Sequence, residues 1–128
     1  MADQRDLKGR VLEVSRRYVT LFSDGVGTLS GTISSKALEV VTGDIVTFDM
    51  RDEGVFVTGA LPATRSLYRS YRGVLKRMGA NIDLLCVITA VGQVLNPTVI
   101  DRMLVAARVQ QIPALLVVNK SDLGLDDL

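Results

Sequence analysis

The sequence predicts two unlike halves, a small β-barrel followed by the start of an α/β domain. Short β-prone runs separated by glycine and polar turns fill the chain from Leu7 to about Ala60, a pattern typical of barrels. Two apolar runs follow, Ile82–Val91 and Ala114–Val118, each of a kind found in strands buried on both faces of a parallel sheet. The segment between them has helical periodicity, as in a βαβ unit.

Composition narrows the class of protein. A length of 128 residues suits one ordinary domain or two very small ones, and 48% hydrophobic residues argue against wholesale disorder. A net charge of +1 gives no overall hint of a nucleic-acid partner. The single cysteine, Cys86, excludes a disulfide framework and a zinc cluster within this chain, and no histidine is present to activate it. No apolar run approaches the ~20 residues of a membrane span, so we expect a cytoplasmic protein without membrane contact.

Residues 1–63 are expected to form a five-stranded OB-type barrel, with a short helical turn at Ser35–Val41 between the third and fourth strands. An SH3-like barrel is the alternative, because periodicity does not separate the two. Aromatic residues on the strands are potential stacking platforms for bases, although we expect most of them to fill the core: Tyr18, Phe22, Phe48 and Phe56. The expected strands are Leu7–Val14, Tyr18–Phe22, Gly27–Ile33, Ile45–Met50 and Val55–Thr58.

Residues 64–78 form a basic linker in this interpretation, with two tyrosines, Tyr68 and Tyr71, and no acidic side chain. Its cations can bind phosphates while the tyrosines stack on bases, which would make it an RNA contact. A solvated connection between domains is the alternative. The cations concerned are Arg65, Arg69, Arg72, Lys76 and Arg77.

Residues 79–128 contain the βαβ unit. Asn96 is a candidate N-cap with Pro97 at the first helical position, and the helix is expected to end near Gln110–Gln111. Its apolar residues recur at helical spacing along one face. One βαβ unit does not bury its own sheet, so we expect these residues to be an incomplete α/β domain. The apolar face of the expected helix consists of Ile100, Met103, Leu104 and Ala107.

Directly after the second apolar run stands Asn119-Lys120-Ser121-Asp122. Ligands of parallel sheets bind outside the carboxyl ends of the strands, so this quartet has the right position for a binding site. The Asp122 carboxylate can accept two hydrogen bonds from the N1–H and exocyclic amine of guanine, whereas adenine presents an acceptor there. Lys120 can lie along the base, and Asn119 can join neighbouring loops. By itself an N-K-x-D quartet also occurs by chance.

Phosphate binding requires a glycine-rich loop followed by Lys and Ser or Thr, yet the dipeptide Gly-Lys is absent from the chain. An ordinary GTPase has this loop before its N-K-x-D strand. Here the quartet follows the barrel and no phosphate-binding loop precedes it. A circular permutation of a GTPase produces this order.

With a barrel first and the N-K-x-D strand after it, the chain resembles the N-terminal portion of the bacterial ribosome small-subunit-dependent GTPase family. Members of that family are circularly permuted and carry an N-terminal OB domain. The resemblance spans almost the whole chain. It rests on Val41–Val46, Arg65–Arg69, Ala80–Asp83, Val99–Leu104 and Val118–Leu123.

The resemblance implies an N-terminal fragment of a GTP hydrolase, with GTP and Mg²⁺ as ligands, acting late in small-subunit maturation. It implies the small ribosomal subunit and its rRNA as partners, guanine contact through Asn119, Lys120 and Asp122, and a zinc site in a C-terminal domain absent here. We expect a monomer that alone hydrolyses little GTP. Two alternatives stay open: a non-enzymatic OB-fold RNA-binding module, and another α/β nucleotide binder in which the quartet is an incidental turn.

Overall fold

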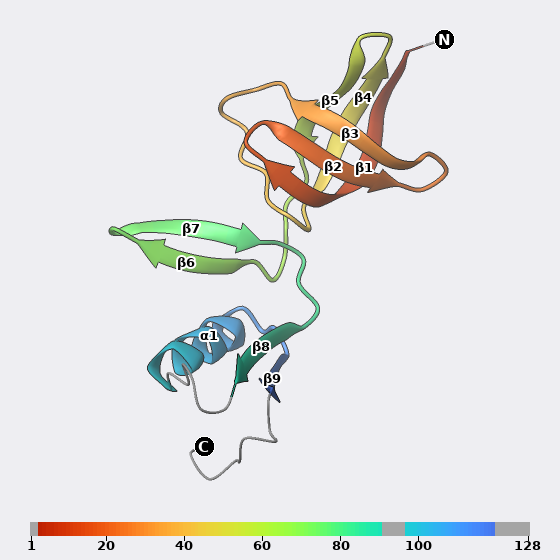
Figure 1. Ribbon diagram of the computed structural model, residues 1–128. Helices are drawn as coiled ribbons and strands as arrows, with labels where there is room; N and C mark the ends of the chain where they lie inside the picture. The colour runs from red at the N-terminus through yellow and green to blue at the C-terminus, as the bar shows by residue number, and fades with distance from the viewer. Residues whose placement is uncertain (1–2, 91–96, 120–128) are drawn as a thin grey trace. The chain divides into compact units, whose positions relative to one another are not determined.

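The computed structural model describes residues 3–90 and 97–119. The chain divides into two compact units, Met1–Asn81 and Ile82–Leu128, and each unit is described by itself (Figure 1). The first unit holds seven strands, and the described part of the second holds two strands and one helix.

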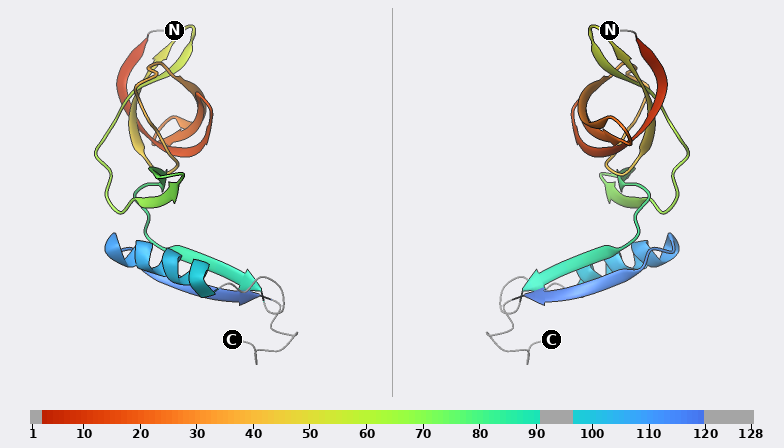
Figure 2. Two further views of the ribbon diagram at one scale, coloured as in Figure 1. Left: turned by 90° about the vertical axis from the view of Figure 1, so that its left-hand side faces the viewer. Right: turned by 90° about the vertical axis from the view of Figure 1, so that its right-hand side faces the viewer.

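The first five strands close into a barrel in the order β1-β2-β3-β5-β4, visible as a ring in Figure 2. The long first strand pairs antiparallel with both β2 and β4, and a short parallel contact between β3 and β5 completes the circuit. This closed Greek-key arrangement confirms the predicted OB-type fold class. The strands are β1 (Gln4–Ser15), β2 (Tyr18–Ser23), β3 (Gly27–Ile33), β4 (Ile45–Arg51) and β5 (Gly54–Ala60).

Alternating apolar side chains fill the barrel, as period-2 strands require. Phe48 and Leu21 are its largest fully buried side chains. The short helical turn expected at Ser35–Val41 is wrong: the Leu38 N–H donates to the Ser35 carbonyl at 3.3 Å in a single tight turn, and no helix forms there. The buried core consists of Val11, Val19, Leu21, Ile33, Val40, Val46, Phe48 and Val57.

The stretch expected as a linker contains an antiparallel hairpin, β6 (Leu67–Tyr71) and β7 (Val74–Gly79), which belongs to the first unit. Tyr71 pairs with Val74, so the connection has two residues, Arg72 and Gly73, with φ of 51° and 76°. Positive φ at both central positions is the signature of the type I′ turn, whose twist matches that of hairpin strands. The basic segment therefore has ordered secondary structure.

In the second unit, β8 (Leu85–Ala90) and β9 (Ala114–Asn119) pair in parallel, and helix α1 (Pro97–Val109) connects them. This confirms the predicted βαβ unit. Asn96 lies outside the described residues. The Ile112 N–H donates to the Ala107 carbonyl at 2.8 Å and closes the helix before the second strand begins. No helix in the described part of the chain is long and apolar enough to cross a membrane.

Candidate functional site

The carboxyl ends of β8 and β9 lie side by side, because Ala90 pairs with Asn119 at the last position of the parallel ladder. Asn119 is exposed at this edge, where a parallel sheet offers its ligand site. Lys120 and Asp122, the other members of the expected guanine site, lie outside the described residues. Within 3–90 and 97–119, no group of three or more His, Cys, Asp or Glu side chains is arranged to hold a metal ion.

The hairpin gathers cations around an exposed aromatic ring. Arg69 pairs with Lys76 across the strands, and Tyr71 occupies the same face two residues further along β6. The guanidinium carbons of Arg69 and Arg72 lie 5.7 Å and 5.3 Å from the centre of the Tyr71 ring, within the range of cation–π attraction. Tyr71 is 56% exposed, so part of its ring stays accessible to a stacking partner.

Arg77 has a different role from the other cations of this stretch. Its Nη1 and Nη2 donate to the two carboxylate oxygens of Asp44, each at 2.8 Å, in a bidentate pair. The Asp44 side chain is fully buried and that of Arg77 is 18% exposed. A guanidinium held in this way is not available to a phosphate, so the basic surface of the hairpin consists of Arg69, Arg72 and Lys76, preceded by Arg65.

Sequence reasoning did not single out Asp44 or Asn81. Asn81 follows the hairpin with φ of 54°, a conformation that asparagine tolerates better than most residues. Its Nδ2 donates to the Gly43 carbonyl at 2.9 Å, and its Oδ1 accepts from the Thr64 N–H at 3.1 Å. Both residues occur in segments that support the family resemblance, but their partners are 33 and 38 positions away, and a single sequence does not show such pairs.

The barrel aromatics differ from expectation. Phe48 fills the core, but Tyr18 and Phe22 are 67% and 44% exposed, so the expectation that most of the aromatics are buried is wrong. Phe56 is half-buried beneath Arg51, whose guanidinium carbon lies 5.2 Å from the ring centre. Tyr18 borders an open hollow that β2 and β3 line together with Glu13 and Val55.

These features define a class: an OB-type barrel joined to a parallel βαβ unit with a polar residue, Asn119, at the carboxyl end of its sheet. The family described as RsgA GTPase matches residues 60–128, more than half of the chain. The chain belongs to the RsgA GTPase family.

Relatives from several bacteria have the same name, small ribosomal subunit biogenesis GTPase RsgA. The protein of Leptospira interrogans is 34% identical over 126 residues, which cover 92% of this chain and 35% of that protein. The Pseudomonas putida protein is 38% identical over 90 residues, covering 69% and 26%. The Pseudomonas savastanoi protein is 42% identical over 86 residues, covering 66% and 25%. The aligned parts of the chain thus span between 25% and 35% of these relatives.

Proposed function

We propose that this chain is the N-terminal portion of a GTPase of small-subunit biogenesis, to which it contributes guanine recognition and rRNA contact. The observation that carries the proposal is the place of Asn119, at the carboxyl end of a parallel strand pair within the segment that matches the family. The names of the relatives supply the biological process. The proposed protein acts in the cytoplasm as a monomer, with the small ribosomal subunit as its partner.

In this proposal Asp122 accepts two hydrogen bonds from guanine, Lys120 packs along the base, and Asn119 joins the loops around them. The amino and N1–H donors of guanine satisfy the carboxylate, whereas adenine leaves it unpaired, so selectivity comes from an unsatisfied polar group. The chain lacks a Gly-Lys dipeptide, so its residues do not fit the phosphates or Mg²⁺. We therefore propose that base recognition occurs here and that this chain alone does not hydrolyse GTP.

The test is the exchange Asp122→Asn in the full-length protein that contains this chain. An amide N–H donates where the carboxylate accepted, so it no longer matches the exocyclic amine of guanine but does match the carbonyl that xanthine has there. Affinity is therefore expected to fall about 100-fold for GTP and to rise for xanthosine triphosphate. Asp101→Asn, the same charge change on the exposed side of α1, is the control and leaves both affinities unchanged. Unchanged GTP affinity in Asp122→Asn would show that the quartet is an incidental turn.

The second part of the proposal, rRNA contact, is supported by the hairpin. An exposed tyrosine flanked by two guanidinium groups offers both stacking and phosphate contacts, the combination that single-stranded RNA recognition uses. We propose that Arg65, Arg69, Arg72 and Lys76 contact phosphates while Tyr71 stacks on a base. The same surface would serve a non-enzymatic RNA-binding module, and the guanine test above distinguishes the two functions.

Filter binding of the chain to small-subunit rRNA tests this contact. Affinity is expected to fall steeply as salt is raised, and Arg69→Gln with Arg72→Gln should reduce the slope of log K against log salt by about 2. Arg102→Gln, on the exposed side of α1, is a control for loss of a positive charge. Salt-insensitive binding, or equal effects of the hairpin and helix variants, would refute the proposed RNA contact.

A further inference from the structure

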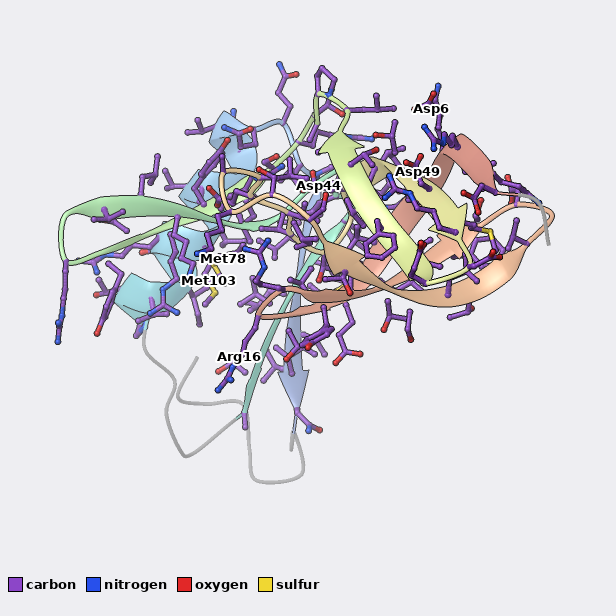
Figure 3. The ribbon with its side chains drawn as sticks, turned by 90° about the horizontal axis from the view of Figure 1, so that it is seen from above. Asp6, Arg16, Asp44, Asp49, Met78 and Met103 are labelled. Carbon is purple, nitrogen blue, oxygen red and sulfur yellow. The ribbon has the colours of Figure 1, made fainter. Side chains whose placement is uncertain are left out.

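The hairpin is tied to the barrel at a buried ion pair. Asp44 is fully buried, and in addition to its two bonds from Arg77 its Oδ2 accepts the Val41 N–H at 2.9 Å. Within residues 3–90 and 97–119, the hydrogen bonds of this carboxylate thus come from its own turn and from β7. In Figure 3 Asp44 is labelled within the first unit. A buried carboxylate satisfied in this way fixes its partner, because releasing Arg77 would leave an unpaired charge inside the protein.

The backbone after β7 makes a second connection to the same turn. The Ala80 N–H donates to the Thr42 carbonyl at 3.0 Å, and Ala80 is 2% exposed. Asn81 then bonds the Gly43 carbonyl through Nδ2 and exchanges bonds with Thr64, on the segment that enters the hairpin. Asp44, Arg77 and Asn81, called the hairpin lock below, therefore hold both the entrance and the exit of the hairpin.

The strands themselves add little to this attachment. In the described ranges, β6 and β7 have dense contacts with each other, and neither has more than sparse contacts with any barrel strand. Their outer residues are open to solvent, with Val74 65% and Leu75 68% exposed. The position of the hairpin relative to the barrel therefore depends on the lock, together with the backbone bond from Ala80 to Thr42 and the bond that Arg10 of β1 donates to the Asn81 carbonyl.

We propose that the hairpin lock positions Arg69, Tyr71, Arg72 and Lys76 for RNA, so that the barrel and hairpin bind RNA as one rigid surface. Asp44 and Asn81 are positioning residues, which act without touching the ligand. This inference rests on the RNA contact proposed above. It adds that the affinity depends on a buried acidic residue, and that a loose hairpin would lose affinity because RNA binding would have to order it.

The sign of the effect separates this inference from simple electrostatics. Removing a negative charge from a protein should strengthen its binding to a polyanion if charge alone matters. The lock requires the opposite for Asp44→Asn. Arg77→Lys is equally informative, because lysine keeps the charge and serves as a phosphate contact but does not form the bidentate fork.

The experiment measures binding of the chain to small-subunit rRNA across a salt series, together with hydrogen exchange of β6 and β7 without RNA. Asp44→Asn and Arg77→Lys are each expected to weaken binding about tenfold, to flatten the salt slope, and to accelerate hairpin exchange roughly tenfold. Asp24→Asn, in the exposed β2–β3 turn, is the matched control and leaves affinity equal or slightly higher. Exchange at the barrel core, around Phe48, reports whether each variant is folded.

Wild-type affinity in Asp44→Asn or Arg77→Lys would overturn the inference, as would unchanged exchange in β6 and β7. If Asp44→Asn does not fold, the RNA affinity and hairpin exchange of Arg77→Lys alone test the inference, because this variant retains a counter-charge for Asp44. Absence of RNA binding by the unchanged chain would refute the proposed RNA contact and the positioning role with it. Loss confined to the variants supports both.

Discussion

Asp49 is a buried carboxylate near one end of the barrel. One of its hydrogen bonds holds the beginning of β1, and another comes from Arg51 on its own strand, β4. Its Oδ1 accepts the backbone N–H of Asp6 at 3.0 Å, and its Oδ2 accepts from Arg51 at 2.9 Å. Figure 3 labels Asp6 and Asp49 in this region. The Asp6 hydrogen bond, followed by the one from Arg51, lowers the pKa of Asp49 from its usual value. Both bonds favour the charged carboxylate.

A lowered pKa in the folded state makes the stability depend on acid. The contribution of Asp49 is present above the unfolded-state pKa of about 3.9 and is lost as the pH falls through the lower folded-state value. We predict that Asp49→Asn lowers the urea midpoint at pH 7 and that the difference from the unchanged chain shrinks steadily below about pH 4. Asp52→Asn, in the exposed β4–β5 turn, is the control. A difference of constant size from pH 7 to pH 2.5 would contradict this account.

Individual residues were the hardest level to predict from the sequence. The pattern placed Asn119 at the end of a strand, because a polar residue after an apolar run marks that end directly. The sequence pattern grouped Arg77 with four other cations as a possible RNA contact. Composition does not show that Asp44, 33 positions earlier, pairs with it. The expectation that most of the four barrel aromatics fill the core failed at Tyr18 and Phe22 for a similar reason, since the face that a strand residue occupies depends on register.

At the level of elements, the turn before β4 must fit closely against the chain that leaves β7. Gly43 has φ of 95°, and a Cβ there would overlap the backbone carbonyl of Ala80. Gly73, in the hairpin turn, has φ of 76° with open space where a Cβ would lie. The two glycines share the backbone requirement, and only Gly43 has the close approach.

We predict that Gly73→Ala lowers the free energy of unfolding by about 1–2 kcal/mol, the usual cost of a left-handed conformation for alanine. Gly43→Ala should lower it by at least about 3 kcal/mol, because the overlapping atom is backbone and must move. Urea denaturation followed by circular dichroism measures both. Equal losses for the two variants would show that the contact between Gly43 and Ala80 is not tight.

Strands and helix of the barrel and βαβ unit were predictable because each has its own period of apolar residues. The hairpin was not, since five cations in residues 65–77 obscure the alternation and its turn is Arg-Gly rather than Asn-Gly. The barrel type needed the structure as well, because the parallel contact between β3 and β5 joins segments that no local pattern relates.

For the whole molecule, the two units differ in how much apolar surface they bury. The barrel closes around eight buried apolar residues. In the described part of the second unit only Val87, Ala107 and Ile112 reach this level, while Ile88 and Leu115 are 70% and 51% exposed. Since burial supplies most of the folding free energy, the units should open at different free energies.

We predict that backbone amides of β8 and β9 exchange with solvent at least tenfold faster than those of β1, β2 and β4.

A pair of variants shows whether the units unfold independently. Phe48→Ala removes the largest core side chain, at a cost of about 3–5 kcal/mol, and should accelerate exchange through the barrel while leaving β8 and β9 unchanged. Ile112→Ala should do the reverse. If Phe48→Ala accelerates exchange equally in all strands, the two units form one cooperative structure, and the barrel does not fold as a separate body.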